Sequence, residues 1–336
     1  MIPRVKIEGL ASSLPSKRIT STQLEERIRK NSKNITLPAG SIEILTGVKE
    51  RRVLDEHLNA SDLATDAAIK ALKKAQLDVS GIDCLLFASA CSDILEPATA
   101  NIVQQNLKAV CPVFDIKNAC NSFLNGMEVA ESFIVAGKYK RVLVVNGEVP
   151  SRAVRYSVEN KDQLRKSFAG YTLGDAGAAM ILGPSDGRSG ILYSEFSSYG
   201  EHWKLSTYMG GGTRYPRDVE KTYFEGETAG LKDVFIDIGP KQIHHTLETV
   251  GWSIDDINKI IVHQVSAKSF NIIADQAKLP MDKIVIVLPE LGNMISASVP
   301  VALDHAQQND ELKSGDKILL IGLASGISIG TFALVW

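Results

Sequence analysis

The sequence predicts an α/β fold in which mostly parallel β-sheets are covered by helices on both faces. Helical and strand patterns alternate along the chain, and the connections between them are short. This alternation is typical of parallel sheets flanked by helices. The 336 residues exceed the roughly 250–300 residues that a single core usually reaches. We therefore expect two layered halves.

The first half begins its alternation with an amphipathic helix at residues 61–76. Apolar side chains recur there at intervals of three and four, with Ser61 as the predicted N-cap. The apolar run at 84–90 then predicts a buried strand. The following segments predict a helix near 97–108, a strand near 112–116, a helix near 120–136 and a strand at 141–147.

The second half repeats this order of elements. Its patterns predict a strand within 255–264, a helix at 266–278, a strand at 283–289, a helix at 296–309 and a strand at 317–322. With a constant offset of 175 residues, CLLFASA (84–90) falls on KIIVHQV (259–265), KNA (117–119) on GNM (292–294), and KRVLVVNG (140–147) on GDKILLIG (315–322). The spacing predicts a duplication with halves at 1–175 and 176–336, and with insertions at 148–172 and 200–232.

Composition and charge exclude several classes of function. The net charge is −2 and the basic residues are scattered, so neither nucleic acid nor an anionic membrane is an expected partner. The N-terminal segment lacks the plan of a signal peptide, and no apolar run reaches the roughly 18 residues of a membrane span. We expect a cytoplasmic protein. The cysteines lack metal-ligand spacing, so no metal site is expected; they are Cys84, Cys91, Cys111 and Cys120.

Cys120 has the sequence context of a nucleophile. It follows the predicted strand near 112–116 and opens the next predicted helix. The positive end of a helix dipole and its free N–H groups favour a thiolate at that place. The alternative is that Cys120 only fills the core, because free cysteine is among the most buried residue types.

His263 and Asn293 occupy comparable places in the second half. His263 ends the strand KIIVH, and ligands bind at the carboxyl ends of strands in parallel α/β sheets. Asn293 lies in the next strand-to-helix connection and matches Asn118 under the offset. The alternatives are a histidine with satisfied hydrogen bonds and an asparagine that caps a helix.

Short motifs are spread over the whole chain. They are TGVKERR (46–52), DIKNACNSF (115–123), AGKYKRVLVVNGE (136–148), LGDAGAAMIL (173–182), VHQ (262–264), GNMISASVPVAL (292–303) and ASGISIGTFALVW (324–336). In these motifs the chain resembles the condensing enzymes related to β-ketoacyl-acyl-carrier-protein synthase III, within the thiolase-like superfamily. The resemblance implies a homodimer with a thiolase-like fold, in which two duplicated halves form a layered α-β-α-β-α arrangement.

The resemblance also implies roles for the candidate residues. Cys120 matches the acyl-accepting nucleophile, and His263 with Asn293 matches the pair that stabilises the enolate of the second acyl thioester. The backbone N–H groups of Cys120 and of Ser325, in the loop 324–326, match an oxyanion hole. The substrates would be thioesters of coenzyme A or of the phosphopantetheine of an acyl carrier protein, with no tightly bound cofactor and no metal.

Glu96 is the candidate general base. The segment SDILEPATANIV (92–103) is similar to that of the head-to-head acyl-CoA condensing enzymes of bacterial olefin biosynthesis, whose matching glutamate enters the partner subunit's active site. Such a base removes an α-proton, so the resemblance favours non-decarboxylative condensation of two acyl-CoAs. Decarboxylative condensation with a malonyl thioester is the alternative. Glu96 before Pro97 could instead serve a helix start.

Other readings remain open at this point. Ser41 and Leu45 stand where the housekeeping synthase III has the Trp and Arg that clasp the coenzyme A adenine, so the donor could be held differently. Lys268 keeps a positive charge where the family often directs an arginine toward the carrier, or it is a solvated helix lysine. Acyl transfer to an alcohol or amine, with His263 as base, and a non-catalytic subunit of a heterodimeric synthase are the rival functions.

Overall fold

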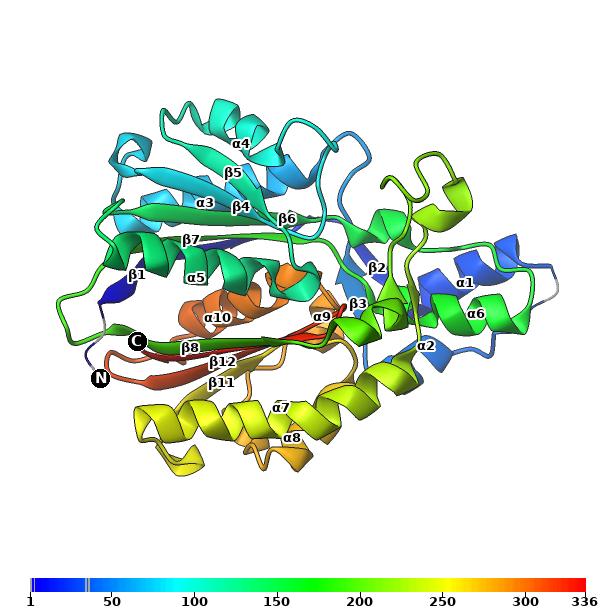
Figure 1. The fold of residues 1–336 in the computed structure, drawn as a ribbon. Helices are drawn as coiled ribbons and strands as arrows, with labels where there is room; N and C mark the ends of the chain where they lie inside the picture. The colour runs from blue at the N-terminus through cyan, green and yellow to red at the C-terminus, as the bar shows by residue number, and fades with distance from the viewer. Residues whose placement is uncertain (1, 3, 34, 36) are drawn as a thin grey trace.

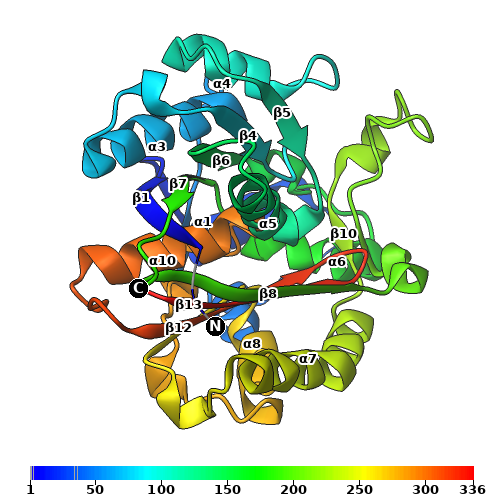
Figure 2. The same cartoon turned by 60° about the vertical axis from the view of Figure 1, so that its left-hand side comes forward.

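Two β-sheets alternate with three layers of helices (Figure 1). The structure is a computed structural model that describes residues 2, 4–33, 35 and 37–336. Helices α3 (Ala60–Ala75) and α4 (Thr99–Leu107) cover the outer face of the first sheet, and α7 (Thr228–Val250) and α8 (Ala267–Gln276) cover the second. Between the sheets lie α5 (Ser122–Val135) and α10 (Ser298–Gln308), most clearly seen in Figure 2. The layered α-β-α-β-α arrangement predicted from the sequence is confirmed.

The four strands of the second sheet have the same order as the first four strands of the five-stranded first sheet. The first runs β1-β7-β6-β4-β5, with β1 (Val5–Ser13), β4 (Cys84–Ala88), β5 (Val113–Ile116), β6 (Val142–Glu148) and β7 (Ala176–Pro184). The second runs β8-β13-β12-β11, with β8 (Gly190–Ser198), β11 (Lys259–Val262), β12 (Lys317–Ala324) and β13 (Ser328–Val335). The strands joined by helical crossovers pair in parallel: β4 with β6 in the first sheet, and β11 with β12 in the second. The next pair in each sheet is antiparallel: β6 with β7, and β12 with β13.

The division at 175/176 stays a prediction, but the pairing of β7 bears on where a boundary falls. β7 begins at Ala176 and pairs with both β1 and β6, so it is part of the first sheet. This pairing favours a boundary in the connection that follows Pro184, rather than before β7.

The turns before the two central helices reveal an error in the predicted offset. Asn118 N–H donates to Ser122 Oγ (2.8 Å) before α5, and Met294 N–H donates to Ser298 Oγ (3.2 Å) before α10. These equivalent bonds lie 176 residues apart (118 to 294), although β4 and β11 keep the predicted offset of 175. The second half therefore has one extra residue between these points, and the predicted match of Asn118 with Asn293 is wrong by one residue.

The strand predicted at 283–289 is reduced to a single bridge between Ile284 and Ile260. The buried side chain of Gln264 takes the place of the missing ladder. Its Nε2 donates to Val285 O (2.7 Å), and its Oε1 accepts from Val287 N–H (3.1 Å). A side-chain amide thus satisfies backbone groups that a neighbouring strand would otherwise satisfy.

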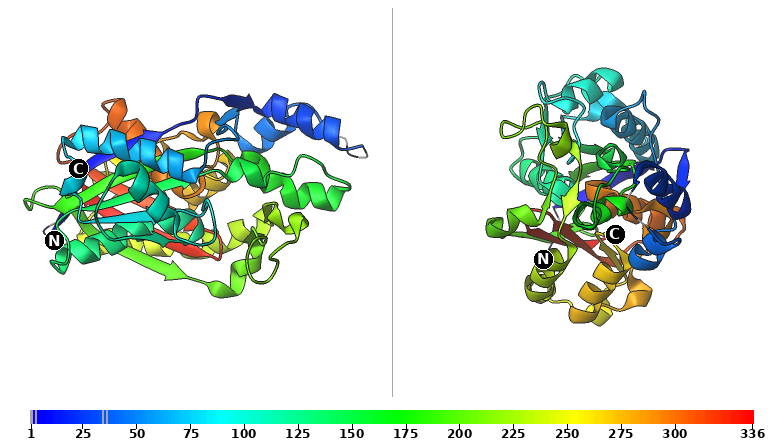
Figure 3. Two further views of the ribbon diagram at one scale, coloured as in Figure 1. Left: turned by 90° about the horizontal axis from the view of Figure 1, so that it is seen from above. Right: turned by 90° about the vertical axis from the view of Figure 1, so that its right-hand side faces the viewer.

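The remaining elements gather mainly at one end of the sheets (Figure 3). They are β2 (Arg18–Thr20), α1 (Ser21–Asn31), α2 (Ser41–Thr46), β3 (Glu50–Arg52), α6 (Lys161–Ser167), β9 (Ser206–Thr207), β10 (Glu225–Gly226) and α9 (Leu288–Leu291). Several come from the insertions predicted at 148–172 and 200–232. A separate apolar cluster around the fully buried Tyr171 holds α1 and α2 against the first insertion. Among the described residues, no helix has both the length and the apolarity that crossing a membrane requires.

Candidate active site

Cys120 lies at a sharp strand-to-helix turn. It is the middle residue of the 3₁₀ helix η2 (Ala119–Asn121), which joins β5 to α5. Ala119 has φ +45°, an uncommon conformation for a residue with a Cβ. The equivalent 3₁₀ helix before α10, η9 (Ile295–Ala297), also begins with a residue of positive φ, Ile295 at +51°. The structural counterpart of Cys120 is therefore Ser296.

The surroundings of Cys120 favour the neutral thiol. Burial of the sulfur, together with the negative charge of Glu148, raises the pKa of Cys120 to about 12. The N–H groups of Ser325 and of Cys120 itself act in the opposite direction. Burial therefore opposes the effect that the predicted helix start was expected to have on the thiol, and α5 itself begins only at Ser122.

The same two N–H groups lie near the Cys120 sulfur. Ser325 follows β12 directly, and its N–H and that of Cys120 both lower the thiol pKa. Asn121 fastens the two segments together, because its Nδ2 donates to the carbonyl oxygen (3.1 Å) and to Oγ (2.9 Å) of Ser328. A thioester carbonyl carbon at the sulfur would thus have its oxygen near two fixed donors.

His263 is a buried, neutral imidazole with open nitrogens. It directly follows β11, and its backbone N–H donates to Ile321 O (2.8 Å) of the neighbouring strand β12. Burial lowers the pKa of His263 to about 4. Neither ring nitrogen has a hydrogen-bond partner among the described residues. A buried hydrogen-bond donor and a buried acceptor without partners raise the free energy of the folded protein. This ring is therefore a candidate for hydrogen bonding to a ligand.

Asn293 is held rigidly by its backbone. Its N–H donates to Thr172 O (2.7 Å), and its carbonyl oxygen accepts from Gly174 N–H (3.0 Å). The side-chain Oδ1 accepts from Ile295 N–H (3.0 Å), whereas no described residue accepts from Nδ2. The amide can therefore donate hydrogen bonds to a ligand.

Topology brings these groups to one edge of the molecule. β11 pairs with β12, so His263 lies beside the end of β12 that leads to Ser325 and thus to Cys120. η9, which follows Asn293, packs against η2. A thiol, two backbone donors, a neutral imidazole and a free amide donor are a suitable set for acyl transfer and for holding an enolate.

Glu96 and Lys268 are not part of this group within one chain. Glu96 is exposed in the connection between β4 and α4. The reading of Glu96 as a helix-capping acid is wrong, because α4 begins at Thr99 and its first N–H groups donate to the Asp115 carboxylate. Lys268 lies exposed near the start of α8.

Three buried polar residues around Cys120 were missed in the sequence. They are Asn121, Glu148 and Ser296. Glu148 could have been found, because a charged residue closes the apolar strand β6 just as His263 closes β11. Asn121 and Ser296 carry no comparable signal.

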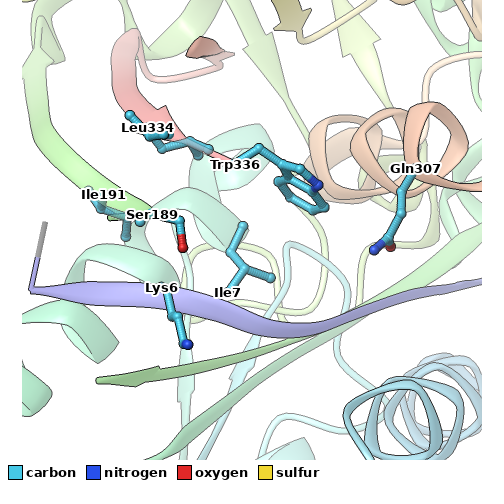
Figure 4. Close-up of a pocket in the computed structure, with 9 residues that line it drawn as sticks. Lys6, Ile7, Ser189, Ile191, Gln307, Leu334 and Trp336 are labelled. Atoms are coloured by element: carbon cyan, nitrogen blue, oxygen red, sulfur yellow. The ribbon is translucent and has the colours of Figure 1, made fainter. Parts of the chain in front are cut away.

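A cavity of about 250 Å³ lies away from this group (Figure 4). Ile7, Leu334 and Trp336 line it, together with Gln307. Leu334 is at the opposite end of β13 from Ser328, so the cavity does not adjoin Cys120. Among the described residues, no three acidic, histidine or cysteine side chains cluster as metal ligands would.

Comparison with known proteins finds matching family models and relatives along the chain. Residues 114–200 match the family model of 3-oxoacyl-[acyl-carrier-protein] synthase III, and residues 247–336 match the model of its C-terminal part. A β-ketoacyl-[acyl-carrier-protein] synthase III of Caldanaerobacter subterraneus subsp. tengcongensis is 32% identical over 98% of this chain and 97% of that protein. An acyl-CoA:acyl-CoA alkyltransferase of Xanthomonas campestris pv. campestris is 29% identical over the full length of both chains.

Solved structures of Xanthomonas campestris OleA have nearly the same fold. A variant with a glutamate replaced by alanine superposes with a TM-score of 0.91 and 28% identity, covering 100% of this chain and 99% of the other. A variant with a cysteine replaced by serine, bound to lauric acid and lauroyl-CoA, also has a TM-score of 0.91 and 28% identity, with full coverage of both chains.

Proposed function

Because the chain belongs to the 3-oxoacyl-[acyl-carrier-protein] synthase III family of condensing enzymes, we propose that it condenses two acyl-CoA molecules without decarboxylation. Membership of the family makes the chain an acyltransferase-type enzyme of the thiolase superfamily. The choice of two acyl-CoAs is supported by the relative named as an acyl-CoA:acyl-CoA alkyltransferase and by the lauroyl-CoA bound to its structural neighbour.

The first half-reaction acylates Cys120. The sulfur attacks the thioester carbonyl, whose oxygen accepts hydrogen bonds from the N–H groups of Cys120 and Ser325. The bond to the coenzyme A sulfur breaks, and the thiol proton leaves with coenzyme A. An acyl-cysteine and free coenzyme A result.

The second half-reaction forms the carbon–carbon bond. The carbonyl oxygen of a second acyl-CoA lies between His263 and Asn293, which donate to the enolate oxygen after Glu96 removes the α-proton. The α-carbon attacks the acyl-cysteine, the bond to sulfur breaks, and Cys120 recovers a proton that Glu96 gives up. The product is a β-ketoacyl-CoA.

The neutral imidazole of His263 favours condensation over acyl transfer to an alcohol or amine. With a pKa lowered to about 4, His263 is a poor base for activating an alcohol or amine, but its N–H is a suitable donor to an enolate oxygen. Asn293, with its free Nδ2, has no role in a simple acyl transfer. The retained Cys120 argues against a non-catalytic subunit.

We assign Glu96 to the active site of the partner subunit in a homodimer. Support comes from its exposed position beside Leu95, whose side chain is 78% exposed. Among the described residues β5 is also an edge strand with β4 as its sole neighbour, and Phe114 on it is partly exposed. Unpaired strand edges and exposed apolar side chains are features of subunit contacts.

Donor binding and location complete the proposal. Coenzyme A thioesters act as donors in the cytoplasm, with an acyl carrier protein as the alternative source of the acyl group. The exposed Lys268 would contact the phosphates or the carrier. A Lys268→Gln variant is expected to raise KM for acyl-CoA while leaving kcat unchanged; an unchanged KM would remove this role.

Incubation of the protein with one acyl-CoA tests the function. Mass spectrometry is expected to find an acyl adduct on Cys120 and an α-branched β-keto product with twice the number of acyl carbons of the donor. Cys120→Ala is the control and should yield neither. An adduct without any β-keto product would contradict self-condensation, and product formation only after addition of malonyl-CoA would establish the decarboxylative alternative.

A further inference from the structure

Glu148 is a fully buried carboxylate at the end of β6. Its Oε1 accepts hydrogen bonds from Ala90 N–H (2.8 Å) and from the hydroxyl of Ser296. Its Oε2 accepts from Cys91 N–H (3.1 Å), and the Cys91 thiol is a further donor. Among the described residues, no lysine, arginine or histidine forms an ion pair with it.

A carboxylate buried without a cation is energetically costly. Burial raises the pKa of Glu148, and the donated hydrogen bonds only partly offset this effect. A packed apolar residue at this position would give a more stable protein. The carboxylate is therefore best explained by the segments that its hydrogen bonds connect.

The donors to Glu148 come from segments that carry separate parts of the proposed site. Ala90 and Cys91 begin the connection that leads to Glu96. Ser296 lies three residues after Asn293, in η9. Between these segments, Glu148 lies close enough to Cys120 for its charge to act on the thiol.

Ser296 occupies in the second half the position that Cys120 occupies in the first. The residue that hydrogen-bonds to Glu148 is thus the structural equivalent of the nucleophile candidate. Ser296 Oγ accepts from Asn146 Nδ2 (3.0 Å) and donates to Glu148. Asn146 Oδ1 in turn accepts from Ala178 N–H (2.8 Å), which fixes the orientation of its amide. The hydroxyl proton of Ser296 is thus directed at the carboxylate.

From these contacts we infer that Glu148 is a positioning residue, whose carboxylate fixes the turn that follows Asn293 beside Cys120 and anchors the segment that carries Glu96 toward the partner subunit's site. This inference rests on the proposed condensation. Glu148 is not itself the base for the α-proton, because both oxygens are occupied by donors and no part of the residue is exposed.

Two substitutions separate the charge of Glu148 from its hydrogen bonds. Glu148→Gln removes the charge and puts an amide NH₂ against the donors, whereas Ser296→Ala removes one donor and keeps the charge. Glu248→Gln, on the outer helix α7, is the matched control. Each protein is assayed for the rate of β-keto product formation from the Cys120-acylated enzyme and a second acyl-CoA, and for the pH dependence of Cys120 alkylation by iodoacetamide, followed by peptide mass spectrometry.

Both site variants are expected to slow condensation by at least about 10-fold, because Asn293 and Glu96 act in that step and a small misplacement of reacting groups is enough for such a loss. Only Glu148→Gln should shift the alkylation profile toward lower pH, because it removes a negative charge that raises the thiol pKa. The titratable groups that respond to this charge are the Cys120 and Cys91 thiols. Glu248→Gln should match the wild type in both assays.

Condensation at the wild-type rate in both variants, with an unchanged alkylation profile, would overturn the inference. If Glu148→Gln does not fold, Ser296→Ala decides, and condensation at the wild-type rate in that variant counts against the inference. A wild-type protein that forms no acyl adduct would contradict the proposed function instead. The alkylation profiles would still decide the role of Glu148 in that case.

Discussion

Asn121 and Ser328 are joined by two hydrogen bonds, although they lie 207 residues apart in the chain. The bonds connect the turn that carries Cys120 to the first residue of β13, just after the loop that carries Ser325. The two N–H groups of the proposed oxyanion hole come from these two segments. Their relative position therefore depends on the Asn121 side chain.

Asn121→Ala should slow acylation of Cys120. Without the bridge, the N–H of Ser325 is no longer fixed against that of Cys120, and we expect the maximal acylation rate to fall by at least about 10-fold. Single-turnover acylation measured at increasing acyl-CoA concentration checks this prediction. The half-saturating acyl-CoA concentration is expected to stay unchanged. Asn309→Ala, at an exposed helix end, is the control. A raised half-saturating concentration with an unchanged maximal rate would contradict a role in the oxyanion hole.

His263→Ala should separate the two half-reactions. His263 is assigned to the enolate, so the acyl adduct on Cys120 should still form, whereas β-keto product should fall by at least about 10²-fold. In the wild type, burial lowers the pKa of His263 to about 4, so the ring is neutral above that pH. The condensation rate should then show no inflection near pH 6.5, the value of an exposed histidine. An inflection there would mean that His263 titrates as an exposed group.

The sequence was sufficient for the fold and for naming candidate site residues, but not for the surroundings of those residues. Alternating apolar patterns and the motifs around Cys120 and His263 are local, so they can be read without a structure. The one-residue error that paired Asn118 with Asn293 arose because only hydrogen-bond register reveals an inserted residue. Desolvation of the Cys120 sulfur could not be predicted from the sequence either, because the residues that bury the sulfur come from segments distant in the chain.

The polar contacts of Glu148 could not be read from the sequence for a related reason. Ala90 precedes it by 58 residues, and Ser296 follows it by 148. Such contacts obey no periodicity, because they depend on where the ends of different strands meet. A buried charge at the end of β6 could be noticed, but its partners required the structure.

Glu96→Gln and Cys120→Ala should complement each other if Glu96 acts in the partner subunit. Each homodimer is expected to lose at least about 10² of its condensation rate, since one lacks the base and the other lacks the nucleophile. A heterodimer contains one site with both residues intact. Co-expression with two different tags and sequential purification isolates it, and we expect about half of the wild-type rate. An inactive heterodimer would place Glu96 in the site of its own subunit or outside the site.

Glu131→Gln should stabilise the protein above neutral pH. Glu131 lies on α5 between the sheets, where burial and the charge of Glu128 raise its pKa from 4.5 to about 7, while a hydrogen bond from Ser194 lowers it. Between these two values the folded state holds a proton that the unfolded state has released. Stability is therefore greatest below pH 4.5 and falls as the pH rises through 7.

Glutamine mimics the protonated carboxyl, so the difference between Glu131→Gln and wild type should itself depend on pH. Urea unfolding is expected to give equal free energies of unfolding near pH 4.5. At pH 8 the variant should be more stable by about 1 kcal/mol, a value reduced from the full shift because Glu131 is only half-buried. Glu248→Gln should match the wild type at both values. A Glu131→Gln variant no more stable than wild type at pH 8 would mean that solvent reaches this carboxylate and relieves the cost of its charge.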